Sequence, residues 1–101
     1  MDVSETIEIE LPDRMDIASA AKMHLNFENV LEQGSGIELK GANVSKLDTA
    51  GVQLLTCFFA AAKSQHVVVE WSGVSGTILD TFRFLNLQQF VDLEEHAGVS
   101  E

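Results

Sequence analysis

The segment Leu47-Asp48-Thr49-Ala50-Gly51-Val52 is where residue types and spacing could do chemistry. Asp48 and Thr49 both have side chains that accept hydrogen bonds from the free amides at the start of a helix. A hydroxyl at that place is also suited to phosphorylation, because the phosphate would face the positive end of the helix dipole. The carboxylate of Asp48 would repel the added charge, so modification of Thr49 could switch an interface off.

The same segment also has a purely structural interpretation. An N-cap at Asp48 or Thr49 and close packing at Ala50 and Gly51 require no further function. Gly51 favours something more, because glycine early in a helix lowers stability relative to alanine. Its missing side chain lets another backbone or a partner surface approach closely. The pattern alone therefore leaves a helix cap and a binding surface both open.

No other residues form a recognisable catalytic or metal-binding set. The chain has neither a Walker-type phosphate loop nor a dinucleotide fingerprint after its first predicted strand. His24, His66 and His96 lie far apart in the predicted elements, whereas metal sites need clustered ligands. The serines on either side of Gly73 have no evident base partner. We therefore expect no enzymatic activity, no catalytic residue, no metal and no cofactor.

Net charge limits the classes of partner. The 101 residues include 6 basic and 16 acidic side chains, for a net charge of −10. An acidic surface repels phosphate backbones and anionic membranes, so nucleic acid and direct membrane insertion are not expected. A basic or mixed protein surface remains, as does simple solubility. The acids crowd both ends of the chain, which we expect to be solvated and flexible.

Length and cysteine content indicate one intracellular domain. A chain of 101 residues has the size of a single domain, 1–101, with a core at about residues 6–93. Cys57 is the single cysteine, so no internal disulfide can form, and its apolar neighbours predict a small core residue. Neither a signal peptide nor an apolar run of about 18 residues is present, which favours a cytoplasmic protein.

Alternating hydrophobic patterns predict an α/β domain. Strands followed by helices favour a small, mostly parallel sheet joined by right-handed crossovers. A valine-rich run is typical of a central strand. The expected strands are 6–11, 37–39 and the central 67–71; the helices are 16–33, one starting at Asp48 or Thr49, and one ending at Asn86; a short element follows at 87–93.

Apolar residues at strand or helix spacing predict the core. Phe58 and Phe59 are adjacent, so either both flank a wide core face or one is exposed. An exposed phenylalanine would extend a binding surface beside Thr49 or form a weak dimer contact. The expected buried residues are Ile7, Ile9 and Leu11, then Ala20, Met23, Phe27, Val30 and Leu31, then Val52, Leu55, Phe58, Phe59 and Ala62, then Ile78, Leu79, Phe82 and Leu85, and finally Phe90 and Val91.

At Asp48-Thr49-Ala50-Gly51 the chain resembles the STAS family, the sulfate-transporter and anti-sigma-factor-antagonist domain. In that family a strand leads to an aspartate, a Ser or Thr, two small residues and a helix. Further matching blocks are Val52-Gln53-Leu54-Leu55, then Val67-Val68-Val69 with Gly73-Val74-Ser75, and Phe84-Leu85-Asn86-Leu87, with Asn86 where Gly is usual. The resemblance covers the chain from Ile7 to Leu93.

The resemblance implies a small mixed α/β fold with helices packed largely on one side, and a protein-binding function without catalysis. It implies Thr49 as phosphoacceptor for an anti-sigma kinase, in signal transduction that regulates transcription. The implied partner-binding residues are Asp48, Thr49, Ala50, Gly51 and Gln53. The Asp-Thr-Ala-Gly form also resembles two other branches: a cytoplasmic subunit of a bacterial phospholipid-transport ATPase, and small proteins that accompany chemotaxis components.

The chain departs from the family pattern in three places. Many regulatory members carry an acid at the end of the strand before the motif, where this chain has Lys40. A kinase interaction or nucleotide contact that uses the acid has no counterpart there. Thr49 replaces the more usual Ser, and the extra first strand that members often have is missing before residues 6–11.

Overall fold

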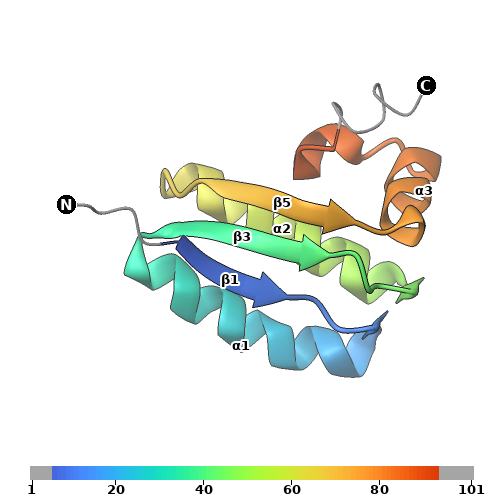
Figure 1. Ribbon diagram of the computed structural model, residues 1–101, viewed down its shortest axis with the longest axis horizontal. Coiled ribbons are helices and arrows are strands. Elements are labelled where there is room, and N and C mark those ends of the chain that lie inside the picture. The colour runs from blue at the N-terminus through green and yellow to red at the C-terminus, as the bar shows by residue number, and fades with distance from the viewer. Residues whose placement is uncertain (1–5, 94–101) are drawn as a thin grey trace.

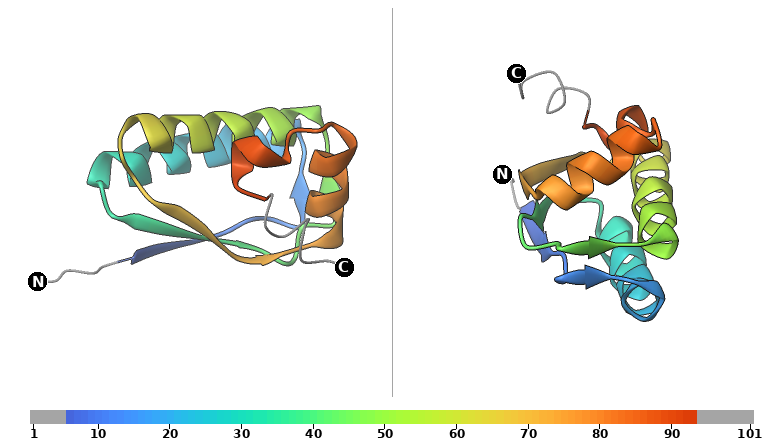
Figure 2. Two further views of the ribbon diagram at one scale, coloured as in Figure 1. Left: turned by 90° about the horizontal axis from the view of Figure 1, so that it is seen from above. Right: turned by 90° about the vertical axis from the view of Figure 1, so that its right-hand side faces the viewer.

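A parallel sheet carries the fold in the computed structural model, which describes residues 6–93. Its three strands lie in the order β1 (Thr6–Glu10), β3 (Gly36–Gly41) and β5 (Val69–Val74). The two long helices, α1 (Ile17–Gln33) and α2 (Thr49–Ser64), cover one face of it (Figure 1, Figure 2). This arrangement confirms the predicted α/β class. Residues 1–5 and 94–101, which include His96 and the outermost acids of both ends, lie outside the described residues.

The central strand is β3, so the prediction that the valine run forms the central strand was wrong. β3 pairs with β1 on one side and β5 on the other, and β5 is an edge strand. Strand β5 also continues to Val74, three residues beyond the expected end at residue 71. A hydrophobic run indicates that side chains of a strand are buried. It does not indicate the position of that strand in the sheet, because strand order depends on the side of the sheet to which each helical crossover leads. Only Val69 of β5 is buried, while Val68 before it is exposed.

A second, two-stranded parallel ladder joins β2 (Arg14–Met15) and β4 (Lys46–Leu47). The ladder lies outside the three expected strands, because strands of two residues show no periodicity. The amides of Ser45 and Lys46 donate to the Asp13 carbonyl at 2.8 and 3.2 Å. The ladder stands directly before both long helices and so holds their N-terminal ends beside each other.

A row of aromatic rings ties both long helices to the sheet. The centroids of Phe27 on α1 and Phe58 on α2 lie 4.0 Å apart in a stacked pair. Phe59 meets Phe58 edge-on at 6.0 Å and Trp71 of β5 at 5.7 Å. Both Phe58 and Phe59 are buried, so α2 has a wide core face and neither phenylalanine is exposed. The expected buried stripe of α2 is confirmed in full: Val52, Leu55, Phe58, Phe59 and Ala62.

Helix α3 (Gly76–Phe84) and the 3-10 helix η1 (Gln88–Val91) pack at one end of the molecule (Figure 2). Ile78, Phe82 and Val91 are buried as expected, and Asn86 has the left-handed φ of 60° that ends the helix. Leu85 and Phe90 were expected in the core but are exposed. Leu85 lies beyond the last turn of α3, and neighbouring residues of η1 point in different directions, so helical spacing no longer applies.

The face of the sheet opposite the helices is polar. Glu8, Glu38 and Glu70 stand in register across the three strands, and Lys40 pairs with Glu8 at 3.1 Å. Within residues 6–93, no helix is long and apolar enough to cross a membrane.

Candidate functional site

The first turn of α2 holds the residues singled out from the sequence. Asp48 is the N-cap, and its Oδ1 accepts a hydrogen bond from the amide of Gly51 at 3.2 Å. Thr49 is the first helical residue and is exposed. No hydrogen bond joins its hydroxyl to another side chain or backbone group within residues 6–93. The capping role therefore belongs to Asp48, and the hydroxyl of Thr49 faces solvent.

Gly51 serves packing inside the chain. A Cβ atom there would lie 2.6 Å from the carbonyl oxygen of Met15 and 2.7 Å from Cδ1 of Leu47. The residue is buried, and Ala50 before it is partly buried. The close approach anticipated from the sequence is thus made by β2. Of the residues proposed for partner binding, Asp48, Thr49 and Gln53 are exposed, whereas Gly51 is covered by its own chain.

The N-terminal ends of α1 and α2 form one surface, because the register pair Met15 and Leu47 lies directly beneath them. Two residues beyond that pair stand Ile17 on α1 and Thr49 on α2, each the first residue of its helix. Ile17 is 76% exposed, an unusual position for a large apolar side chain. We name Asp16, Ile17, Asp48, Thr49 and Gln53 the helix-start surface. Ile17 is the member that the sequence analysis missed, because it begins a helix whose apolar stripe lies elsewhere.

Asp16 repeats on α1 the role of Asp48 on α2. Its Oδ1 accepts from the amide of Ser19 at 3.0 Å. This backbone hydrogen bond lowers the pKa of Asp16, and the nearby charge of Arg14 adds to the effect. Both caps are therefore carboxylates that satisfy free amides, which places two acidic side chains on the helix-start surface.

A cavity of about 410 Å³ lies beside this surface. Arg14 and Lys46 are register neighbours on β2 and β4 and bring two cations to it. Thr77 of α3 reaches the same place, where its hydroxyl donates to the carbonyl of Ser45 at 3.4 Å. The lining residues are Arg14, Met15, Asp16, Ser45, Lys46, Leu47, Asp48 and Thr77. The cavity lining thus carries both basic and acidic side chains, which can bind polar groups of a protein partner.

Lys40 is engaged within the sheet. Its Nζ lies 3.1 Å from Oε1 of Glu8, and this hydrogen bond to the carboxylate raises the pKa of Lys40. Glu38 and Glu10 also stabilise its charge. The position where regulatory members carry an acid is therefore a cation in an ion pair, on the sheet face that the helices leave open.

A family model described as "Mlab, STAS domain" matches residues 2–94, nearly the whole chain. The chain belongs to the STAS domain family. No curated protein matches it. The STAS domain assignment confirms the resemblance drawn from the motif and makes this chain a regulatory or protein-interaction module.

In this STAS domain the remaining candidate residues stand apart from the motif. Cys57 is exposed, so the prediction of a core cysteine was wrong: it lies between the positions of α2 that face the sheet. His24 pairs with Glu28 at 3.2 Å on the surface of α1. His66 follows α2 with a left-handed φ of 61°. Within residues 6–93, no three His, Cys, Asp or Glu side chains are grouped to hold a metal ion.

Proposed function

We propose that this STAS domain binds an anti-sigma factor or a similar signalling kinase through the helix-start surface, and that phosphorylation of Thr49 releases the partner. The observation that carries the proposal is the placement of Ile17 and Thr49, each the first residue of its helix and each two residues beyond the register pair Met15 and Leu47. One contributes an exposed apolar side chain and the other an accessible hydroxyl. An exposed apolar side chain can provide binding energy for a partner, and a phosphate on the nearby hydroxyl can then weaken that binding.

Charge explains the direction of the switch. The chain carries a net charge of −10, and Asp48 and Asp16 cap the two helices at this surface. A partner that meets it is expected to be basic or mixed in charge. A phosphate on Thr49 adds about −1.5 to −2 charges next to the Asp48 carboxylate. That carboxylate is held by the amide of Gly51, so it cannot turn away without loss of the cap.

Incubation with kinases encoded near this gene, in the presence of ATP, tests the switch. Intact mass spectrometry should show one added phosphate, and fragmentation should place it on Thr49. The Thr49→Ala chain is the matched control and should remain unmodified. Phosphate that is still added to the Thr49→Ala chain would assign the modification elsewhere.

Partner binding tests the surface independently of the kinase. We expect Thr49→Ala to retain the partner, Thr49→Glu to weaken it, and Ile17→Ser to weaken it as well. A partner that binds all three chains as tightly as the unaltered one uses another face.

Lys40 favours a second candidate function. It is paired with Glu8 at the position where regulatory members carry an acid, so a kinase contact that uses the acid at that position has no counterpart here. The chain would then be a constitutive subunit of a transport ATPase, with Thr49 as an unmodified contact. Pull-down from the source cells separates the two. An ATPase as main partner, together with unmodified Thr49 in the recovered protein, favours the subunit.

A further inference from the structure

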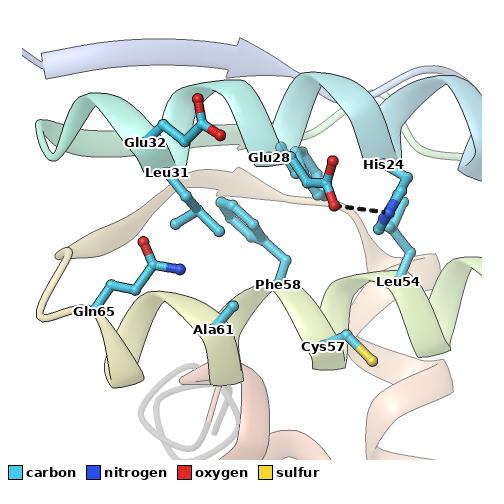
Figure 3. A pocket seen from close by; sticks show the side chains of 10 residues that line it. His24, Glu28, Leu31, Glu32, Leu54, Cys57, Phe58, Ala61 and Gln65 are labelled. Carbon is cyan, nitrogen blue, oxygen red and sulfur yellow. Dashed lines mark ion pairs between the residues drawn. The ribbon is translucent and has the colours of Figure 1, made fainter.

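An open groove runs between α1 and α2, on the outer side of the two helices (Figure 3). It encloses about 420 Å³. The stacked rings of Phe27 and Phe58 belong to its lining, and Leu31, Leu54 and Ala61 add further apolar surface. The complete lining is His24, Phe27, Glu28, Leu31, Glu32, Leu54, Cys57, Phe58, Ala61 and Gln65. None of these residues belongs to the helix-start surface.

The groove is acidic along one side. Its lining contains Glu28 and Glu32 of α1 and neither lysine nor arginine. Glu28 is exposed and meets His24 at 3.2 Å. Glu32 lies in the last turn of α1, which contains no basic residue, so the negative end of the helix dipole there is reinforced and not neutralised. A cation on a partner is therefore favoured toward the C-terminal end of the groove.

The length of the groove fits a short helix. From Leu54 to Gln65 the wall formed by α2 extends about 16 Å at about 1.5 Å per residue. Roughly three turns of an added helix cover that length, with apolar side chains at spacings of three and four residues. A second copy of this chain is a poor occupant, because each copy has a net charge of −10.

We propose that the groove is a second docking surface, which takes an amphipathic helix from a protein partner. Apolar side chains of that helix pack on the partly buried Leu54 and Ala61, above the buried rings of Phe27 and Phe58 that form the floor of the groove. Lysine or arginine side chains beside the apolar stripe pair with Glu28 and Glu32. This surface works whether or not Thr49 is modified, and so goes beyond the proposed switch.

Cys57 supplies a direct readout, because it is the single cysteine of the chain, is exposed and lines the groove. The probe is a synthetic three- to four-turn helical peptide with a leucine stripe flanked by lysines. A peptide with the same leucines and glutamates in place of the lysines is its control. We expect the lysine peptide to slow alkylation of Cys57 by iodoacetamide several-fold and the glutamate peptide to leave the rate unchanged.

Charge reversal locates the cationic contact. The double variant Glu28→Lys with Glu32→Lys should weaken binding of the lysine peptide by roughly tenfold, in line with two lost surface ion pairs and the added repulsion. Glu38→Lys with Glu70→Lys makes the same change in net charge on the open sheet face and is the matched control. It should weaken binding by less than about threefold, since distant exposed charges are screened by salt. Circular dichroism verifies that both variants are folded.

Three results would overturn the groove proposal. The first is equal protection of Cys57 by the two peptides. The second is a loss of affinity in the control variant as large as that in the groove variant. The third is protection of Cys57 when the concentration of the chain alone is raised, which would indicate self-association. The Thr49→Glu chain separates this inference from the proposed function. It should bind the lysine peptide like the unaltered chain, even if no kinase ever modifies Thr49.

Discussion

A Cβ atom at Gly51 would lie 2.6 Å from the carbonyl oxygen of Met15, so α2 begins in direct contact with the backbone of β2. The same Met15 carbonyl accepts a hydrogen bond from the amide of Asp48 at 3.2 Å. These two contacts set the distance between the first turns of α1 and α2. The small residue of the family motif therefore places Thr49 beside Ile17 by packing within the chain.

Gly51→Ala should destabilise the protein. Overpacking costs about 1–3 kcal/mol, while better helix propensity returns up to about 1 kcal/mol, so we expect a net loss of about 1–2 kcal/mol. Urea unfolding followed by circular dichroism measures it. Gly76→Ala is the control, because Gly76 begins α3 with nothing within 4 Å of an added Cβ. Equal stability of the two variants would mean that α2 can shift away from β2 freely.

Asp48→Ala should lower stability by about 1 kcal/mol, because the amide of Gly51 loses its acceptor. Asp48→Asn should cost less, since asparagine caps helices about as well as aspartate. Chemical denaturation of both variants separates the cap from the charge. If the proposed surface recognises a basic partner, Asp48→Asn should also weaken binding despite its intact cap. Similar losses of stability in both variants would assign the effect to charge alone.

Asp16 should contribute stability that depends on pH in the acid range. Its pKa in the folded protein is lowered from 3.8, chiefly by the hydrogen bond from the amide of Ser19. A lowered folded pKa gives stability that is present above the unfolded pKa and lost as pH falls through the folded pKa. The stability difference between the unaltered chain and Asp16→Asn should therefore shrink on acidification below 3.8. Urea midpoints measured at several pH values check this. A difference that stays constant across that range would contradict it.

Lys40→Glu should destabilise the sheet more than Lys40→Gln. The change replaces a cation paired with Glu8 by a fifth carboxylate among Glu8, Glu10, Glu38 and Glu70, and like charges on adjacent strands repel. Raising the salt concentration should reduce the difference in stability between the two variants. At 1 M salt the screening length is about 3 Å, so repulsion between the exposed carboxylates is largely screened. Thermal unfolding at low and high salt measures it. A difference in stability that is the same at low and high salt would indicate that the substitutions act through lost side-chain packing and not through charge.

Local patterns predicted most elements correctly. Helix α1 ends where Gly34 takes a left-handed φ, as expected, and α2 begins after Asp48, one of the two residues that the sequence offered as its cap. These features depend on neighbours within a single turn. The strand order could not be predicted in the same way, since β5 looked like a buried central strand but lies at the edge. The β2–β4 ladder could not be predicted either, because strands of two residues have no pattern to detect.

The sequence by itself determined the motif at the start of α2, a cap at Asp48 or Thr49 and the apolar face behind it, because capping and helical periodicity are local properties. The tertiary structure decided what surrounds the motif. Pairing of β2 with β4 sets Ile17 beside Thr49, and Gly51 packs against Met15. Packing of α1 against α2 leaves Cys57 exposed at an acidic groove. These relationships join residues about 30 positions apart in the sequence. Contacts over that separation depend on strand pairing and helix packing across the whole domain, not on local sequence.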